Sequence, residues 1–228
     1  MILRAEKLAM RYMRRTGQAN YFYAVRDASL QLRPGEVTVL MGRSGSGKTT
    51  LLHMLSGLLT PTGGRVLLGE MDLYTLGDRA LSRLRNEKIA VVPQGRSAID
   101  SLTVLENVLL PGAMVGIEDQ KTARHWLEVL GIEPLADTRP AELSGGELRR
   151  MAIARALARN PAVLLADEPT GDLDDASTRQ VLDVLGDAAR DRGAAVLIVS
   201  HDSEAASCAD AMARLGGGVL TVMGESIK

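Results

Sequence analysis

One glycine-rich segment, residues 42–49, limits the possible folds of this chain more than any other stretch. Its sequence, Gly-Arg-Ser-Gly-Ser-Gly-Lys-Thr, matches the phosphate-binding pattern G-x-x-x-x-G-K-[ST] at every fixed position. The apolar run Val37–Met41 before it predicts a strand, and residues 49–55 after it have the pattern of a helix that ends at Gly57. A strand, a glycine-rich loop and a helix in this order predict an α/β fold built around a phosphate-binding loop.

The residue types of this loop suit a bound triphosphate. Its glycines let the backbone curl so that successive N–H groups point into one concavity, and the following helix adds the partial positive charge of its N-terminus. Lys48 supplies a point charge for the outer phosphates, and the hydroxyl of Thr49 is placed to ligate Mg²⁺. The glycine spacing, G-x-x-G-x-G, differs from the dinucleotide pattern G-x-G-x-x-G. We therefore predict that a nucleoside triphosphate is bound by Gly42, Arg43, Ser44, Gly45, Ser46, Gly47, Lys48, Thr49 and Thr50.

Composition narrows the class of protein further. The chain has 228 residues, of which 46% are hydrophobic and 24% are charged, and its formal net charge is −1. Because this balance provides no basic field, we expect no nucleic-acid partner. The lone Cys208 forms no internal disulfide, which fits a reducing compartment. Residues 1–6 lack the layout of a signal peptide, and no apolar stretch reaches the roughly 20 residues that span a bilayer, so we expect a membrane role only through a partner.

Four apolar runs, at 37–41, 89–92, 163–166 and 195–200, alternate with helical stretches. Continuous apolar strands of this kind form parallel sheets that are buried on both faces. Because ligands bind at the carboxyl ends of such strands, we predict that the polar groups following them meet at one edge of the sheet. These groups are the phosphate loop, Gln94, Asp167 with Glu168, and His201.

Other stretches predict additions to this sheet. Residues 2–8 and 28–32 predict short strands. Between them lie Tyr12 and the run Tyr21-Phe22-Tyr23, an aromatic cluster that either stacks on adenine or fills the edge of a sheet. From Gly95 to Pro140 the pattern is helical, which predicts an inserted helical subdomain. The tail around Gly216-Gly217-Gly218 resembles a hairpin between two short strands.

A capping box, S-x-x-E, starts a further helix at Ser144 and Glu147. On its own, this pattern indicates only where the helix begins. Together with Gly145 and Gly146, the helix N-terminus is also a second candidate site for an anion.

Taken in order, these motifs resemble those of ATP-binding-cassette (ABC) ATPases, and the resemblance covers essentially the whole chain. Tyr12 stands where that family has its adenine-stacking aromatic residue, with Tyr23 as the alternative. The matching segments are Gly42–Thr49 (Walker A), Gln94 (Q-loop), Leu143–Glu147 (the LSGGE signature), Val163–Asp167 with Glu168 (Walker B and the catalytic glutamate), Gly171–Asp174 (D-loop) and His201 (switch histidine).

The resemblance implies a single ABC ATPase domain over residues 1–228. In such a fold a phosphate-loop NTPase core, with a mostly parallel sheet and N-terminal antiparallel strands, would comprise residues 1–94 and 161–228, and a helical subdomain would comprise 95–160. It also implies a homodimer in which two cassettes face each other head to tail around two ATP molecules. The D-loop, which includes Asp174, is one of the motifs of that dimer. The signature residues of one cassette would contact the ATP bound by its partner; they are Ser144, Gly145, Gly146 and Glu147.

The family also implies a role for each group at the strand ends. Thr49 and Gln94 would ligate Mg²⁺, and Asp167 would hold it through water. Glu168 would polarise the attacking water and His201 would support the γ-phosphate, so that phosphoryl is transferred to water. ATP would close the dimer and hydrolysis would reopen it, and a membrane protein would sense that motion in the groove around Gln94.

Narrower similarities point to one branch of the family. Residues 81–94, 103–111 and 166–171 resemble the lipoprotein-release, macrolide-efflux and antimicrobial-peptide-export ATPases. In that branch, separate cassettes power FtsX-like permeases at the cytoplasmic face of the inner or plasma membrane, so we expect export or efflux. The chain departs from the branch at Leu148 (usually Gln), at Asp172 (usually Asn) and in Gly95–Ile99, which lacks the usual aromatic residue.

Two other classes of protein compete with this interpretation. A soluble ABC ATPase of translation or DNA repair is the main alternative, but repair members insert a long coiled coil between the Walker motifs and translation factors usually carry two cassettes. This chain has no sustained heptads in that region and has one cassette. A phosphate-loop kinase would leave the LSGGE motif and His201 without explanation.

Overall fold

The structure is a computed structural model that describes residues 1–13, 21–171, 173–202 and 204–225. In these residues, one 10-stranded sheet has the order β5-β4-β1-β2-β10-β9-β3-β8-β7-β6. The strands from β9 to β6 are parallel, which confirms the predicted parallel sheet. Their bounds are Ala211–Gly216 (β9), Val37–Met41 (β3), Ala195–Ser200 (β8), Val163–Asp167 (β7) and Ile89–Val92 (β6).

The central strands β7 and β8 are buried along their whole length, so both of their faces are covered, because successive side chains of a strand point to opposite sides. On one face, Leu164 and Ala166 of β7 join a core that includes residues of α5 (Gly145–Leu157) and α6 (Asp175–Arg190). On the other face, Leu165 joins a second core that contains α1 (Lys48–Leu55). The two cores fix the sheet between helix layers, so the strand ends have defined positions.

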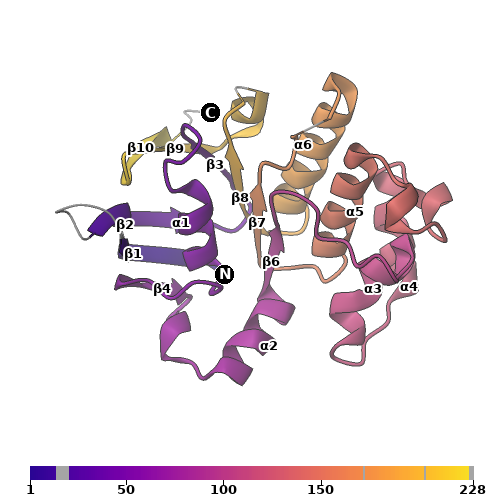
Figure 1. The fold of residues 1–228 in the computed structure, drawn as a ribbon, viewed down its shortest axis with the longest axis horizontal. Coiled ribbons are helices and arrows are strands. Elements are labelled where there is room, and N and C mark those ends of the chain that lie inside the picture. Colours follow the sequence, from indigo (N-terminus) through magenta and orange to yellow (C-terminus); the bar gives the residue numbers. More distant parts are fainter. Residues whose placement is uncertain (14–20, 172, 203, 226–228) are drawn as a thin grey trace.

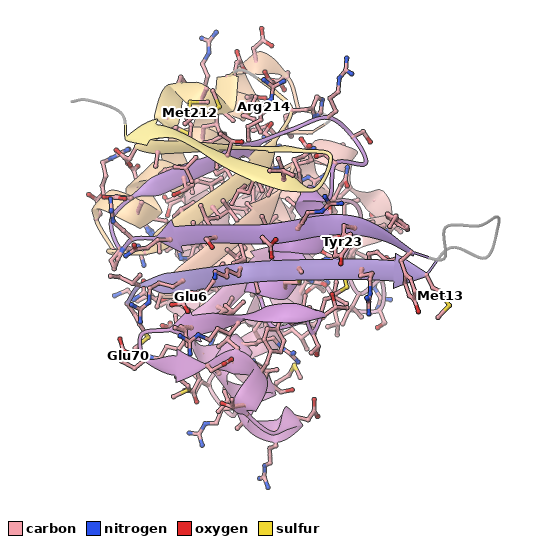
Figure 2. All side chains as sticks on the ribbon, turned by 90° about the vertical axis from the view of Figure 1, so that its left-hand side faces the viewer. Glu6, Met13, Tyr23, Glu70, Met212 and Arg214 are labelled. Atoms are coloured by element: carbon pink, nitrogen blue, oxygen red, sulfur yellow. The ribbon has the colours of Figure 1, made fainter. Side chains whose placement is uncertain are left out.

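The antiparallel part of the sheet is longer than the sequence predicts. Strand β1 spans Leu3–Met13 and β2 spans Tyr21–Leu32, whereas we expected strands only over 2–8 and 28–32. An irregularity in the pairing at Lys7, whose φ is 50°, breaks the alternation of buried and exposed residues, so the pattern ends before the strand does. Figure 2 shows these two strands side by side with β4 (Gly63–Leu68), with Tyr23 and Met13 toward the same end.

The remaining strands complete this side of the sheet. The predicted tail hairpin is present, since β9 pairs antiparallel with β10, and β10 in turn pairs with β2 through Val219 and Arg26. The tail is thereby brought against the N-terminal hairpin. The strands not yet given are β5 (Met71–Asp72) and β10 (Val219–Glu225).

The helices α3, α4 and α5 are grouped at the end of the molecule opposite the antiparallel strands, with the parallel strands between (Figure 1). Residues 95–160, all of which are described, contain no strand. The capping boxes at Ser144 on α5 and Thr103 on α3 start their helices through reciprocal side-chain bonds. None of the helices in the described ranges is long and apolar enough to cross a membrane. The other helices are α2 (Asp78–Lys88), α3 (Val104–Ala113), α4 (Gln120–Val129) and the 3₁₀ turns Leu73–Thr75, Glu133–Leu135, Pro140–Glu142 and Glu204–Cys208.

Candidate active site

The carboxyl ends of the parallel strands open into a cleft of about 820 Å³. The structure brings together there the polar groups that follow four different strands, as the sheet topology requires. The predicted residues that line the cleft are Tyr12, its alternative Tyr23, Arg43, Ser44, Gly45, Ser46, Gly47, Lys48, Thr49, Thr50, Gln94, Asp167, Glu168 and His201.

The glycine-rich loop is packed against the backbone of two other strands. A Cβ atom on Gly47, whose φ is 102°, would lie 2.1 Å from the carbonyl oxygen of Ala24 in β2. A Cβ on Gly42 would lie 2.5 Å from the carbonyl oxygen of Leu215 in β9. Helix α1 then begins at Lys48, and among the described residues no side chain caps its N-terminus, so the first amide groups of the helix lie at the cleft without a side-chain acceptor there. These features form a cradle for an anionic group.

Lys48 is buried, and its side chain folds back on the first residues of the glycine-rich loop. Its Nζ donates to the carbonyl oxygens of Gly42 at 2.7 Å and Arg43 at 3.3 Å. The same ammonium group lies 3.8 Å from Oε1 of Glu168. Its three donors therefore face carbonyl and carboxylate oxygens, which are the types of acceptor that phosphate oxygens replace.

Asp167 is the most buried of the acidic residues in the cleft, with 2% of its surface exposed. Its Oδ2 accepts a hydrogen bond from Thr49 Oγ1 at 2.7 Å, and its Oδ1 is buried without a partner among the described residues. Burial raises the pKa of this carboxyl group; the hydrogen bond from Thr49 opposes the rise, and the nearby charge of Glu168 adds to it. A buried carboxylate oxygen that lacks a partner and lies beside a hydroxyl fits a divalent cation.

The donor atoms also fit Mg²⁺ in type. Thr49, Asp167 and Gln94 offer hydroxyl, carboxylate and amide oxygens, which are hard ligands. Within the described ranges, no group of three or more His, Cys, Asp or Glu side chains could hold a metal ion alone. Mg²⁺ in nucleotide sites is bound by one or two protein oxygens together with phosphate oxygens, so this donor set suits an ion that arrives with a nucleotide.

Glu168 and His201 form a pair at the ends of β7 and β8. Glu168 Oε2 lies 2.9 Å from His201 Nδ1, and the backbone N–H of Glu168 donates to the carbonyl oxygen of Val199 at 2.8 Å. The φ of Glu168 is 49°, a left-handed conformation that costs a non-glycine residue about 1 kcal/mol or more. The surrounding bonds maintain this conformation and aim a buried carboxylate into the cleft.

The aromatic end of the cleft contains both candidates for the adenine-stacking residue. Tyr12 packs on Phe22, with ring centroids 5.7 Å apart, while the guanidinium of Arg26 lies 4.9 Å from the centre of the Tyr23 ring. Both tyrosines line the cleft, so the geometry leaves each in reach of a base. Phe22, which belongs to the aromatic cluster predicted as a possible stacking face, also lines the cleft. Sequence reasoning missed three lining residues, for which no local pattern gives a signal: Ala24, Gly217 and Gly218.

The signature residues and the D-loop aspartate do not line this cleft. Ser144 Oγ accepts from the backbone N–H of Glu147 at 3.3 Å, and Glu147 Oε2 accepts from the N–H of Ser144 at 2.7 Å. Asp174 caps α6 by accepting from the N–H of Ser177 at 2.9 Å. Leu148 is half-buried against the helical core, and Asp172 lies outside the described residues. The remaining signature positions, Gly145 and Gly146, form the first turn of α5.

Comparisons with known proteins agree with this geometry. A sequence model of the family described as ABC transporter matches residues 25–171. The ABC transporter ATP-binding protein YtrE of Bacillus subtilis (strain 168) is 38% identical over 207 residues, which are 90% of each chain. Two solved structures of MJ0796 are each 32% identical and cover 99% of both chains. One is a dimeric bacterial ABC transporter cassette with a TM-score of 0.92, and the other is a dimeric post-hydrolysis state of the ATP-binding cassette bound to ADP and Pi with a TM-score of 0.91. The chain belongs to the ABC transporter family and is an ATP-binding cassette with the ABC ATPase fold.

Proposed function

We propose that this chain is the ATP-hydrolysing subunit of an ABC transporter and that it works as a homodimer around two ATP molecules. The observation that carries the proposal is the division of the site into two parts. The cleft holds the groups for phosphate and water, whereas the signature residues Ser144–Glu147 lie outside it at the start of α5. A second copy, facing the first head to tail, would bring its signature residues to the open side of the cleft. The dimeric cassettes of MJ0796 support this arrangement.

In the proposed complex, the triphosphate binds to the loop and to the start of α1. Lys48 exchanges the carbonyl oxygens of Gly42 and Arg43 for phosphate oxygens. Thr49 and Gln94 would ligate Mg²⁺, and Asp167 would hold it through water. The ion would neutralise phosphate charge and stabilise the charge that develops on the transferred phosphoryl group.

Hydrolysis in this proposal depends on Glu168. Its carboxylate accepts a hydrogen bond from the attacking water and orients it, as a general base does. His201 bonds to Glu168 through Nδ1, which leaves Nε2 as the atom that would reach the γ-phosphate. Little covalent chemistry falls to the protein in phosphoryl transfer, so the rate would come from positioning and from charge stabilisation.

We further propose that the dimer drives an FtsX-like permease from the cytoplasmic face of the membrane, for export or efflux. The support is the similarity of residues 81–94, 103–111 and 166–171 to that branch. In this proposal, residues 1–94 and 161–228 form the catalytic core and residues 95–160 form the helical subdomain. The strand-free run over 95–160 supports the division.

The experiment that tests the proposal is the mass in solution of purified Glu168→Gln protein with and without ATP. We expect a monomer that becomes a dimer only with ATP, because slow hydrolysis preserves the closed state. The matched control is the double variant with Lys48→Ala, which should stay monomeric because it binds no ATP. A Glu168→Gln protein that binds ATP and stays monomeric would contradict the shared site for the isolated subunit.

A further inference from the structure

The segment that carries Gln94 has few attachments of its own. Strand β6 ends at Val92, the last residue paired with β7, and Pro93 has no N–H to donate. No backbone–backbone hydrogen bond connects residues 93–98 to any other described part of the chain. Gly95 has a φ of 86°, so regular structure does not continue through the segment either. Something else must set the position of Gln94 in the cleft.

Two arginines of α5 supply these attachments. Arg149 Nη1 donates to the carbonyl oxygen of Pro93 at 2.9 Å, on one side of Gln94. Arg155 Nη1 donates to the carbonyl oxygen of Ser97 at 2.8 Å, on the other side. Hydrogen bonds from a guanidinium are charge-assisted and therefore stronger than those between neutral groups. The Gln94 segment is thus bonded to one helix at both of its ends.

The surroundings of Arg149 indicate a specific role for this side chain. It is 9% exposed, and its hydrogen bond to Pro93 is made without an ion pair to any described carboxylate. A buried guanidinium needs acceptors for its N–H groups, and the carbonyl oxygen of Pro93 is one that the described residues supply. Its Nη2 also lies 3.9 Å from where a Cβ on Gly171 would be, and the N–H of Gly171 donates to the carbonyl oxygen of Glu168. Arg149 therefore lies between the Gln94 segment and the loop that follows Glu168.

We propose that Arg149 and Arg155 are positioning residues that fix the Gln94 segment to α5, so that Gln94 moves with this helix and not with β6. The proposal deepens the proposed function, on which it rests for the role of Gln94 at Mg²⁺. Helix α5 begins at the signature serine, Ser144. The helix that would meet the partner's ATP would thereby also set the position of a Mg²⁺ ligand in its own cleft.

The attachment itself can be tested without nucleotide, because the segment contains a trypsin site after the exposed Arg96. In Arg149→Gln and Arg155→Gln proteins, we expect cleavage after Arg96 to be about tenfold faster, as the loss of one charge-assisted hydrogen bond predicts. The matched control is Arg85→Gln, because Arg85 of α2 donates in the same way to the carbonyl oxygen of Gly57 at 2.8 Å, away from the segment. Unchanged cleavage in both variants, with folding confirmed by circular dichroism, would overturn the proposal.

The second measurement is the Mg²⁺ concentration that half-saturates ATP hydrolysis. We expect Arg149→Gln and Gln94→Ala each to raise it about tenfold, and the double variant to be no worse than Gln94→Ala alone, because Arg149 acts through Gln94. Arg149→Lys keeps one donor for the carbonyl oxygen of Pro93 and should restore most of the wild-type value. Additive losses in the double variant would overturn the proposed coupling.

The two measurements separate the two levels of the argument. If Gln94→Ala leaves the Mg²⁺ requirement unchanged, the Mg²⁺ role of Gln94 in the proposed function is wrong, and the trypsin assay still decides whether the arginines hold the segment. If Gln94→Ala changes the requirement and Arg149→Gln does not, the positioning role of Arg149 is wrong while the proposed function stands.

Discussion

Two helices of this protein begin at glycine-rich motifs, and they differ in whether a side chain caps the N-terminus. Helix α1 starts at Lys48 inside the cleft, and no side chain in the described part of the chain caps it. Helix α5 starts after Ser144 with a complete capping box, in which the carboxylate of Glu147 occupies the positive end of the helix. The hydrogen bonds from the Ser144 backbone and hydroxyl lower the pKa of Glu147, so this carboxylate stays charged over the whole physiological range.

The difference shows how each motif can meet a phosphate. The uncapped start of α1 offers its amide groups and an ammonium in a closed cradle, so a single chain can hold the phosphates there. The capped start of α5 already has an anion of its own and is exposed, so it can add only a few contacts to a phosphate held by another molecule. Binding strength should therefore depend on α1, and assembly on α5. Four experiments test this comparison.

The largest effect should come from Lys48→Ala. We expect it to lower the affinity for ATP about 100-fold or more, because a buried ammonium makes charge-assisted bonds to phosphate. Isothermal titration calorimetry measures this directly. Lys121→Ala, which removes an exposed lysine of α4, is the control and should bind like wild type. Retained affinity in Lys48→Ala would mean that the cradle around α1 is not the phosphate site.

Glu168→Gln should slow hydrolysis by about 10²-fold or more, the scale for losing a positioned base, while ATP affinity stays within about twofold. The amide keeps the size of the side chain but no longer accepts a proton from water. Steady-state phosphate release measures the rate. Glu142→Gln, at an exposed position before the signature, should hydrolyse ATP at the wild-type rate. Near-normal turnover in Glu168→Gln would mean that a different residue activates the attacking water.

Ser144→Arg should weaken ATP-driven dimerisation at least about tenfold without unfolding the monomer, because it places a bulky side chain where the partner's nucleotide would lie and removes one hydrogen bond of the cap. Sedimentation in the Glu168→Gln background measures the effect. Thr103→Arg is the matched control, because it breaks the equivalent capping box of α3 with Glu106. If Ser144→Arg and Thr103→Arg dimerise equally well, the claim that assembly depends on the start of α5 is wrong.

Tyr12→Ala should have the smallest effect, a loss of about fivefold to tenfold in ATP affinity, because this exposed ring should contribute about 1 kcal/mol, the low end of what stacking on a base supplies. Affinity for inorganic triphosphate, which has no base, should not change, and this comparison removes any effect on the cradle. Tyr23→Ala is the competing variant on the neighbouring strand. A larger loss in Tyr23→Ala than in Tyr12→Ala would move the stacking position to Tyr23.

The four parallel strands β3, β8, β7 and β6 and the capped start of α5 could be predicted from the sequence because their signals are local. An apolar run such as Val163–Ala166 is buried on both faces wherever it occurs in an α/β sheet, and Ser144 with Glu147 caps a helix within one turn. The topology rule for parallel strands then gave the edge at which Gln94, Asp167 and His201 meet.

The extent of the N-terminal hairpin and the complete lining of the cleft could not be predicted in this way. The pairing irregularity at Lys7 interrupts the sequence pattern of β1, so the second half of this strand was not predicted. The contact between Phe22 and Tyr12 follows from their pairing across the hairpin, which only the structure shows. Gly218 reaches the cleft because the tail pairs with β2, where the N–H of Arg26 donates to its carbonyl oxygen at 2.7 Å.

Residue types, their order and short spacings determined that this chain is an α/β ATPase with a phosphate loop, because glycine curvature, capping and strand burial act over a few residues. Only the tertiary structure decided that Arg149 holds the carbonyl oxygen of Pro93, which is 56 residues away in the chain. A bond of this kind depends on how α5 packs against the end of β6, and such packing leaves no periodic trace in the sequence.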